Sequence, residues 1–267
     1  MEGLAKKHID LAKVLAAKGI KPRRWLVRFL NRLLHVDEIN EVLDICGDRE
    51  GVEFAQAVMD YLNITVDLKN AERIPKDSNP IIIANHPLGG PDGMALIAAV
   101  GSVRDDICFP VNDFLMYVEQ LKPVFVPVDK VHGNRNTADG INAAFAKENC
   151  LLYFPAGLCS RRIKGKITDL EWKPTVVKKA IQHHRDIIPV HIEARNRRRF
   201  YTIANLRKRL GIKFNFEMAL LPGEMFAQRG KTFTMTVGEP IPWQTLDDGT
   251  LPYEWAQRLH DQIYTIK

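Results

Sequence analysis

The sequence predicts an α/β protein, with a central, largely parallel or mixed sheet flanked by helices and an N-terminal helical segment before it. From about residue 74, short apolar runs alternate with stretches of helical spacing, which is typical of alternating strands and helices. Several of these runs are continuously apolar, which indicates strands that are buried on both faces. We therefore expect a helical segment over residues 1–70 and an α/β domain over 71–267.

The N-terminal segment has the spacing of helices. The stretch "PRRWLVRFLNRLLH" (22–35) begins with a proline that suits the first turn of a helix. Its apolar residues share one face, and three arginines share another. The apolar face consists of Trp25, Leu26, Phe29, Leu30, Leu33 and Leu34. The basic face consists of Arg24, Arg28 and Arg32. Helical spacing continues over 40–64, with breaks around Gly47 and Gly51.

The alternating part of the chain predicts six strands and five helices. The strands are expected at 80–84, 106–111, 124–128, 150–154, 187–193 and 232–238. The helices are expected at 93–101, 112–120, 137–148, 174–184 and 251–264.

The composition is that of an ordinary globular protein, with 46% hydrophobic and 26% charged residues among 267. The formal net charge of +6 suits anionic lipid, nucleic acid or an acidic carrier protein as a partner. The four cysteines form no CxxC pair and no zinc-like spacing with histidines, so we expect a reduced, cytosolic chain without a metal. The sequence contains neither a secretory signal nor a window of about 20 consecutive apolar residues, so we expect no membrane span.

The first motif that carries chemistry is "NHPLGGPD" (85–92), which follows the apolar run 80–84. His86 would then lie at the carboxyl end of a buried strand, where open α/β sheets bind ligands. A histidine whose one ring nitrogen is held by a carboxylate presents the other as a base, so His86 and Asp92 suit general-base catalysis. In a plainer interpretation, His86 completes the strand end and Asp92 only caps the next helix.

A second motif, "CLLYFPAGLCSRR" (150–162), repeats this arrangement of a buried run, a tight turn and polar residues. Backbone N–H groups around Gly157 could accept negative charge, and Arg161 and Arg162 could bind an anionic head group. The alternative is a strand that is followed by a solvated basic loop.

The blocks "NHPLGGPD", "FPAGLCSRR" (154–162) and "VGEPI" (237–241), in this order, resemble the PlsC-like superfamily of glycerol-3-phosphate and lysophosphatidate acyltransferases. They are most similar to its hemolysin-like branch, which includes proteins associated with amino-acid-containing lipids such as ornithine and glycine lipids. The resemblance covers about residues 75 to 242. It implies the α/β fold of these acyltransferases.

The resemblance also implies an acyl transfer from a thioester donor, acyl-ACP (acyl carrier protein) or acyl-CoA, without a metal, a cofactor or a covalent acyl-enzyme. The catalytic pair of the family falls on His86 and Asp92. We expect the substrates to contact Asn85, Gly89, Gly90, Lys130, Arg135, Phe154, Pro155, Gly157, Ser160, Arg161 and Arg162. The glycine turns are candidates for the oxyanion donors.

Three departures from the family pattern bear on the acceptor. Five residues separate His86 from Asp92, one more than is usual, and Ala156 stands where the family has glutamate. Only Lys130 or Arg135 could replace the arginine that grips glycerol phosphate. These departures favour a lysolipid or an N-acyl amino-acid lipid as acceptor, through its hydroxyl rather than an amine.

The charge pattern predicts that the protein reaches this acceptor at a membrane surface. Nine lysines and arginines lie in the first 32 residues against Glu2 and Asp10, beside the Trp25/Phe29/Leu33 stripe. Each basic residue near an anionic leaflet contributes about 1 kcal/mol. We therefore expect a cytoplasmic protein peripheral to the inner face of the membrane. In the alternative, the stripe packs on the α/β domain. The basic run 195–216 could also face the membrane or bind an acidic carrier.

Two other functions remain as alternatives. One is a non-catalytic basic protein that binds lipid or nucleic acid, because counterion-driven binding would use the same residues. The other is a thioesterase, which would use water as acceptor. The presence of both motifs, 85–92 and 154–162, in this order favours the acyltransferase. We therefore expect a lipid acceptor as partner and no nucleic acid.

Overall fold

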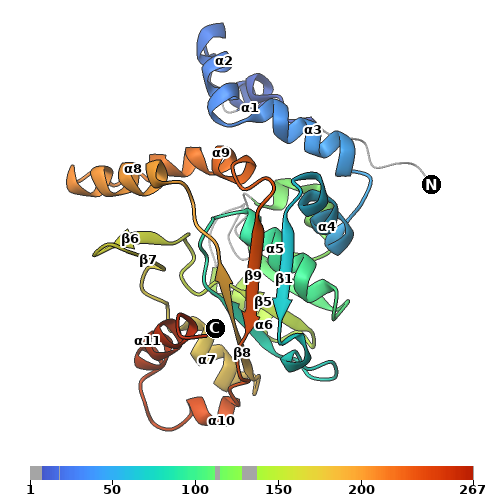
Figure 1. Ribbon diagram of the computed structural model, residues 1–267, viewed down its shortest axis with the longest axis vertical. Coiled ribbons are helices and arrows are strands. Elements are labelled where there is room, and N and C mark those ends of the chain that lie inside the picture. The colour runs from blue at the N-terminus through green and yellow to red at the C-terminus, as the bar shows by residue number, and fades with distance from the viewer. Residues whose placement is uncertain (1–7, 18, 112–114, 128–136, 267) are drawn as a thin grey trace.

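The computed structural model describes residues 8–17, 19–111, 115–127 and 137–266. Within these residues, seven strands form one sheet in the order β1-β9-β8-β2-β5-β3-β4. Helices cover both faces of this sheet (Figure 1). The strands are β1 (Thr65–Lys69), β2 (Ile81–Ala84), β3 (Ile107–Val111), β4 (Phe125–Pro127), β5 (Cys150–Tyr153), β8 (Ile187–Glu193) and β9 (Thr232–Val237). A separate hairpin consists of β6 (Arg161–Ile163) and β7 (Lys166–Thr168).

The helices precede, connect and follow these strands. They are α1 (Leu11–Ala17), α2 (Arg24–Leu33), α3 (Val36–Cys46), α4 (Gly51–Tyr61), α5 (Pro91–Gly101), α6 (Thr137–Phe145), α7 (Thr175–Gln182), α8 (Arg198–Arg209), α9 (Leu221–Phe226), α10 (Trp243–Leu246) and α11 (Pro252–Ile263).

Strand β2 lies at the centre of the sheet and is fully buried. Ile82 and Ala84 pack in the core under α4 and α5, whereas Ile81 and Ile83 pack in the core under α6, α7 and α11. Since both faces need apolar side chains, the run is continuously apolar.

Strands β2, β3, β4, β5 and β8 run parallel to one another, and β9 is antiparallel to β8. The carboxyl ends of the five parallel strands therefore meet at one edge of the sheet. The side chain of Asn85 extends the pairing at this edge, because it donates to Ile192 O at 3.0 Å and accepts Ile192 N–H at 2.7 Å. These two bonds hold the end of β2 against β8 just before His86.

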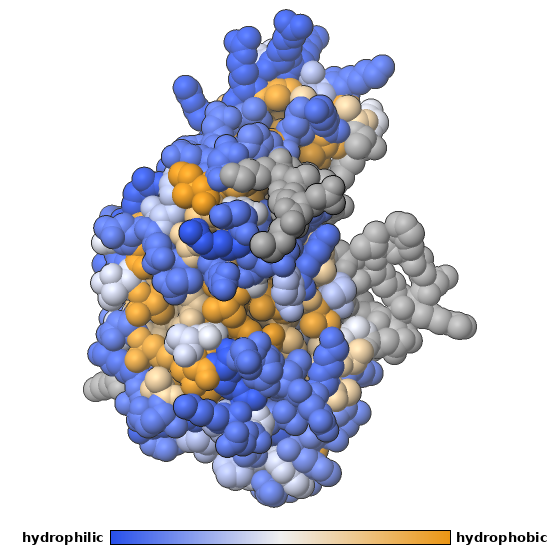
Figure 2. Space-filling model, turned by 90° about the vertical axis from the view of Figure 1, so that its right-hand side faces the viewer, coloured by the Kyte–Doolittle hydropathy of each residue, from blue (hydrophilic) through white to orange (hydrophobic). Residues whose placement is uncertain are grey.

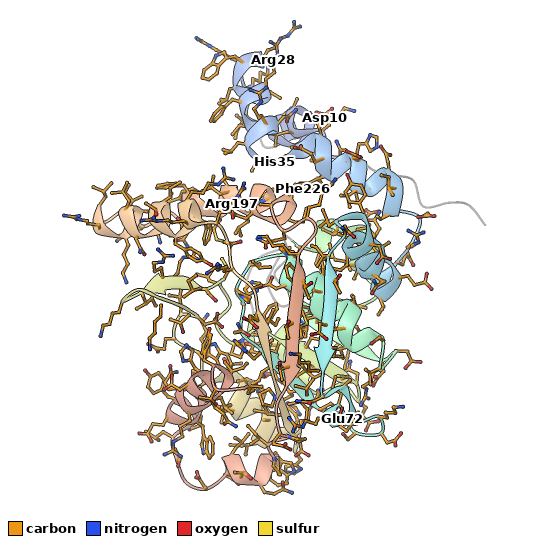
Figure 3. All side chains as sticks on the ribbon, viewed as in Figure 1. Asp10, Arg28, His35, Glu72, Arg197 and Phe226 are labelled. Carbon is orange, nitrogen blue, oxygen red and sulfur yellow. The ribbon has the colours of Figure 1, made fainter. Side chains whose placement is uncertain are left out.

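Helices α1 to α3 lie beyond α9 from the sheet (Figure 1). At this end of the molecule, hydrophilic side chains project around smaller apolar areas (Figure 2). His35, which precedes α3, contacts Phe226 of α9 with ring centroids 5.7 Å apart (Figure 3). A Cβ atom on Gly223 would come within 2.7 Å of His35 Nε2, so the two elements approach closely.

The six predicted strands are all present. The helices expected over 93–101, 137–148, 174–184 and 251–264 correspond to α5, α6, α7 and α11. Of the helix expected over 112–120, residues 112–114 lie outside the described residues, and the rest forms two short 3₁₀ turns, Leu115–Tyr117 and Glu119–Leu121. Strand β1, the hairpin and α8 were not expected. The segment expected to be helical up to residue 70 thus includes a strand that pairs with β9.

Candidate active site

The carboxyl edge of the sheet carries a histidine that is bonded to a buried carboxylate. His86 Nδ1 lies 2.9 Å from Asp92 Oδ2. The Asp92 side chain is 0% exposed, and the His86 side chain is 15% exposed. His86 follows the end of β2, and Asp92 lies in the first turn of α5. Asp92 therefore fixes Nδ1 from inside the protein, and the His86 side chain keeps a small exposed fraction.

The backbone of the loop between them is organised by the same carboxylate. Asp92 accepts N–H groups from Leu88 at 2.8 Å, Gly90 at 3.0 Å and Gly93 at 3.1 Å. Gly89 has φ of +87°, and a Cβ atom there would lie 2.8 Å from Leu221 Cδ1. Position 89 thus requires glycine for both its conformation and its close packing.

Opposite charges set the protonation of the pair. Burial disfavours the imidazolium, but the charge and hydrogen bond of Asp92 outweigh it, so the pKa of His86 is raised. Burial likewise disfavours the Asp92 carboxylate, but the charge of His86 and the backbone N–H bonds hold the Asp92 pKa below its ordinary value. The ring is thereby prepared to accept a proton.

Phe154 fixes the plane of the His86 ring. The two rings stack with centroids 4.1 Å apart and an interplanar angle of 18°. Phe154 in turn packs edge-on against Phe109 at 5.3 Å. The second sequence motif therefore contacts the first directly, as residue 154 covers one face of the imidazole.

The backbone of His86 is also held, and by residues that are remote in sequence. Ser160 N–H donates to His86 O at 2.7 Å, and His86 N–H donates to both carboxylate oxygens of Asp169, at 3.1 and 3.2 Å. The sequence interpretation included Ser160 but not Asp169. Asp169 belongs to no recognisable motif in the sequence. Only its tertiary contacts distinguish it from other aspartates.

The two predicted arginines have different environments. Arg161 is buried, donates to Cys159 O at 2.6 Å and pairs with Glu217 at 3.1 Å. Arg162 is half-buried, and its guanidinium lies 5.7 Å from the Tyr201 ring centroid. Among the described residues, Arg162 Nε is buried without a hydrogen-bond partner.

The predicted glycine turns are internally bonded. Gly89 and Gly90 direct their N–H groups at Asp92, and Gly157 N–H donates to Phe154 O at 3.1 Å. Pro155 accepts Lys173 N–H at 3.4 Å through its carbonyl. The amide of Asn85 is occupied by β8, as described above. Lys130 and Arg135 lie outside the described residues.

Other chemistry has less support near His86. Burial raises the pKa of the Cys159 thiol to about 11, which disfavours a thiolate nucleophile. In the described part of the chain, no three His, Cys, Asp or Glu side chains gather as metal ligands. Two hollows of about 340 and 580 Å³ lie beside Asn79 and Arg104, away from the His86 loop. None of the described helices is both long and apolar enough to cross a bilayer.

Comparison with known proteins assigns the chain to a family. A family model described as "Acyltransferase" matches residues 4–267. The chain belongs to the acyltransferase family. A protein of Phocaeicola vulgatus named lyso-glycine lipid O-acyltransferase is 42% identical over 264 residues, which cover 97% of this chain and 95% of that protein. A protein of the same name from Bacteroides thetaiotaomicron is also 42% identical, with 97% of both chains covered.

The fold of this acyltransferase has a counterpart among solved structures. The crystal structure of PlsC, the 1-acyl-sn-glycerophosphate (LPA) acyltransferase of Thermotoga maritima, matches with a TM-score of 0.51 at 15% sequence identity. The match covers 95% of this chain and 87% of the other. This match confirms the predicted α/β fold, and the family model and the two relatives confirm the predicted resemblance to acyltransferases.

Proposed function

We propose that this acyltransferase transfers a fatty acyl group from a thioester donor, acyl-ACP or acyl-CoA, to the hydroxyl of a lyso-glycine lipid. The observation that carries the proposal is the 2.9 Å contact between His86 Nδ1 and the fully buried Asp92. Such a contact leaves Nε2 as a base for a hydroxyl proton. The names of the two relatives support the acceptor class.

The reaction needs one base and no covalent acyl-enzyme. The acceptor oxygen attacks the thioester carbonyl carbon while His86 Nε2 takes the hydroxyl proton. The tetrahedral intermediate then collapses, the carbon–sulfur bond breaks, and the imidazolium returns its proton to the departing thiolate. The products are an ester and the free thiol of the carrier. Asp92 stabilises the imidazolium that forms between these two steps.

Arg162 is the better candidate for binding the acceptor's head group. An N-acyl glycine keeps a free carboxylate, which a guanidinium can bind in a bidentate way. Arg161 already pairs with Glu217, whereas the buried Nε of Arg162 has no hydrogen-bond partner among the described residues. Arg162 also lies two positions after Ser160, whose N–H bonds to the backbone of His86.

Peripheral membrane contact is supported by two exposed apolar surfaces. No residue of α2 is buried, and Trp25 and Phe29 are 63% and 57% exposed, so this stripe does not pack on the α/β domain. Near the end of α8, Leu210 and Phe214 are 64% and 77% exposed. Arginines and lysines accompany both surfaces, which suits the inner leaflet of a cytoplasmic membrane.

An acyl-transfer assay tests the proposal. Purified protein is given acyl-ACP or acyl-CoA with and without lyso-glycine lipid, and free thiol and diacyl product are measured by colorimetry and mass spectrometry. His86→Ala is expected to lower product formation at least about 100-fold. The matched control, His184→Ala, removes a histidine that stacks on Trp243 instead.

Two results would contradict the proposal. Product formation by His86→Ala at the wild-type rate would exclude His86 as the base. Thiol release that is equally fast without lipid would identify a thioesterase.

A further inference from the structure

A second buried carboxylate lies beside His86. Asp169 directly follows β7 and is 2% exposed. Besides the His86 backbone N–H, it accepts the Ser160 hydroxyl at 2.6 Å and Trp172 Nε1–H at 3.0 Å. Every one of these partners donates to Asp169. This pattern matches an ionised carboxylate, which can only accept.

Within the part of the chain that the structure describes, the charge of Asp169 has no cationic partner of its own. The ion pairs among the described residues leave it out, since Arg161 and Arg207 on this side of the site both pair with Glu217. A buried carboxylate without a cation is costly even when it is hydrogen-bonded. A neutral side chain could also accept the His86 N–H. Hydrogen bonding alone therefore does not explain why residue 169 is a charged carboxylate.

We propose that Asp169 is a positioning residue for acyl transfer: it fixes the backbone of His86 and supplies a second buried negative charge when the imidazole takes the acceptor's proton. This inference rests on the proposed role of His86 as the general base. Asp92 would hold the ring through Nδ1, and Asp169 would hold the same residue through its backbone.

The charged groups around His86 agree with this role. Burial lowers the pKa of His86, Asp92 raises it most, Asp169 raises it further, and Arg161 lowers it. The Tyr264 hydroxyl accepts the Asp169 backbone N–H at 2.7 Å and is neutral, because burial raises the Tyr264 pKa above its ordinary value. Among the described residues, the imidazolium therefore has two carboxylates and one guanidinium as its charged neighbours.

Asp169→Asn removes the charge while most of the contacts can be kept. An amide oxygen in place of Oδ2 keeps the bonds from Trp172 and from the His86 N–H at 3.2 Å. An amide nitrogen in place of Oδ1 can donate to Ser160 Oγ, and the 3.1 Å contact of the His86 N–H is lost. The Ser160 hydroxyl can then donate to His86 O, which lies at 3.2 Å in the wild type. The substitution thus tests the charge of residue 169 with little change of shape.

The first measurement is the dependence of kcat/KM on pH. Loss of the Asp169 charge is expected to lower the apparent pKa of the low-pH limb by roughly 0.5–1 unit. It is also expected to lower kcat about tenfold. The matched control is Glu224→Gln, which neutralises a fully buried carboxylate that pairs with Arg197 and Arg199. In this control, the apparent pKa of the low-pH limb of kcat/KM should stay at the wild-type value.

The second measurement is independent of turnover. The pKa of the His86 ring is followed by ¹⁵N NMR, with His86→Gln assigning its signal. Because this pKa can be measured without substrate, failure of the proposed acyl transfer is separable from failure of the role of Asp169. A folded Asp169→Asn variant with wild-type His86 pKa and wild-type kcat would overturn the inference.

A second neutral variant, Asp169→Ser, keeps the inference testable should Asp169→Asn not fold. Its hydroxyl is smaller than the amide and can accept the His86 N–H. The His86 pKa and kcat are expected to fall in the same direction as in Asp169→Asn. A folded Asp169→Ser variant with the wild-type His86 pKa and the wild-type kcat would overturn the inference.

Discussion

Substitution of Asp92 by asparagine should separate the position of the His86 ring from its basicity. The carboxylate oxygen Oδ2 accepts from His86 Nδ1 at 2.9 Å and from Leu88 N–H at 2.8 Å. With the amide oxygen toward Gly90 and Gly93, the amide nitrogen would face both of these groups. The neutral ring would then accept at Nδ1 and carry its proton on Nε2. The nitrogen available to the acceptor would no longer be a base.

The magnitudes follow from these contacts. A histidine base held in the wrong tautomer loses about 10⁴-fold in rate, which corresponds to about 5.4 kcal/mol of transition-state stabilisation. The buried Leu88 N–H would lose its acceptor, which costs about 1–3 kcal/mol in the free energy of unfolding. The activity loss should therefore exceed the stability loss, and folded but nearly inactive protein is expected.

The assay is kcat/KM against pH, together with urea unfolding. Since a base must be neutral, the wild-type rate should fall as pH drops through the His86 pKa, which Asp92 raises above the ordinary value of a histidine. In Asp92→Asn this limb should move to lower pH. Asp261→Asn is the matched control, because Asp261 contacts His260 Nδ1 at 2.8 Å but is 83% exposed. A folded Asp92→Asn enzyme within tenfold of wild type would refute the reasoning.

Three further predictions follow from the site and the surface. Gly89→Ala is expected to lower the free energy of unfolding by about 1–3 kcal/mol in urea titrations, because φ is +87° and a Cβ atom would lie 2.8 Å from Leu221 Cδ1 and 3.1 Å from Cys159 Cβ; unchanged stability would contradict this packing. Arg162→Gln should raise the KM for lyso-glycine lipid about tenfold or more with little effect on the KM for the donor; steady-state kinetics in which both KM values stay unchanged would exclude Arg162 as the head-group ligand. Joint replacement of Leu210 and Phe214 by glutamate should weaken sedimentation with anionic vesicles about tenfold, and loss of carrier-protein binding instead would assign this surface to the donor.

The elements predicted from the sequence are those whose burial dictates their composition. Strand β2 is apolar throughout because both of its faces are covered, and the stretch before α5 shows its turn through glycine and proline. Strand β1 was missed because it pairs only with β9 and alternates between exposed and half-buried residues. Helix α8 was missed because its arginine-rich sequence obscures the apolar positions, of which Phe200 and Ala204 are buried.

Some contacts of the candidate site could be predicted from the sequence, and others could not. His86 and Asp92 lie within one short loop, so local spacing was sufficient to predict their contact. Asp169 reaches His86 across 83 residues, and no local pattern distinguishes it from other aspartates. Arg161 and Arg162 are adjacent and chemically identical in the sequence. Only Glu217, 56 residues away from Arg161, assigns one of them to an internal ion pair.

The sequence by itself determined the α/β class, the position of the candidate site at the strand ends and the contact between His86 and Asp92. These features depend on periodicity and on contacts within a few residues. The tertiary structure alone decided that Asp169 bonds to the backbone of His86, that the glycine N–H groups are bonded internally and that Trp25 and Phe29 of α2 are exposed. Each of these depends on which distant segments share a surface, because burial and the pairing of charges are properties of the packed chain.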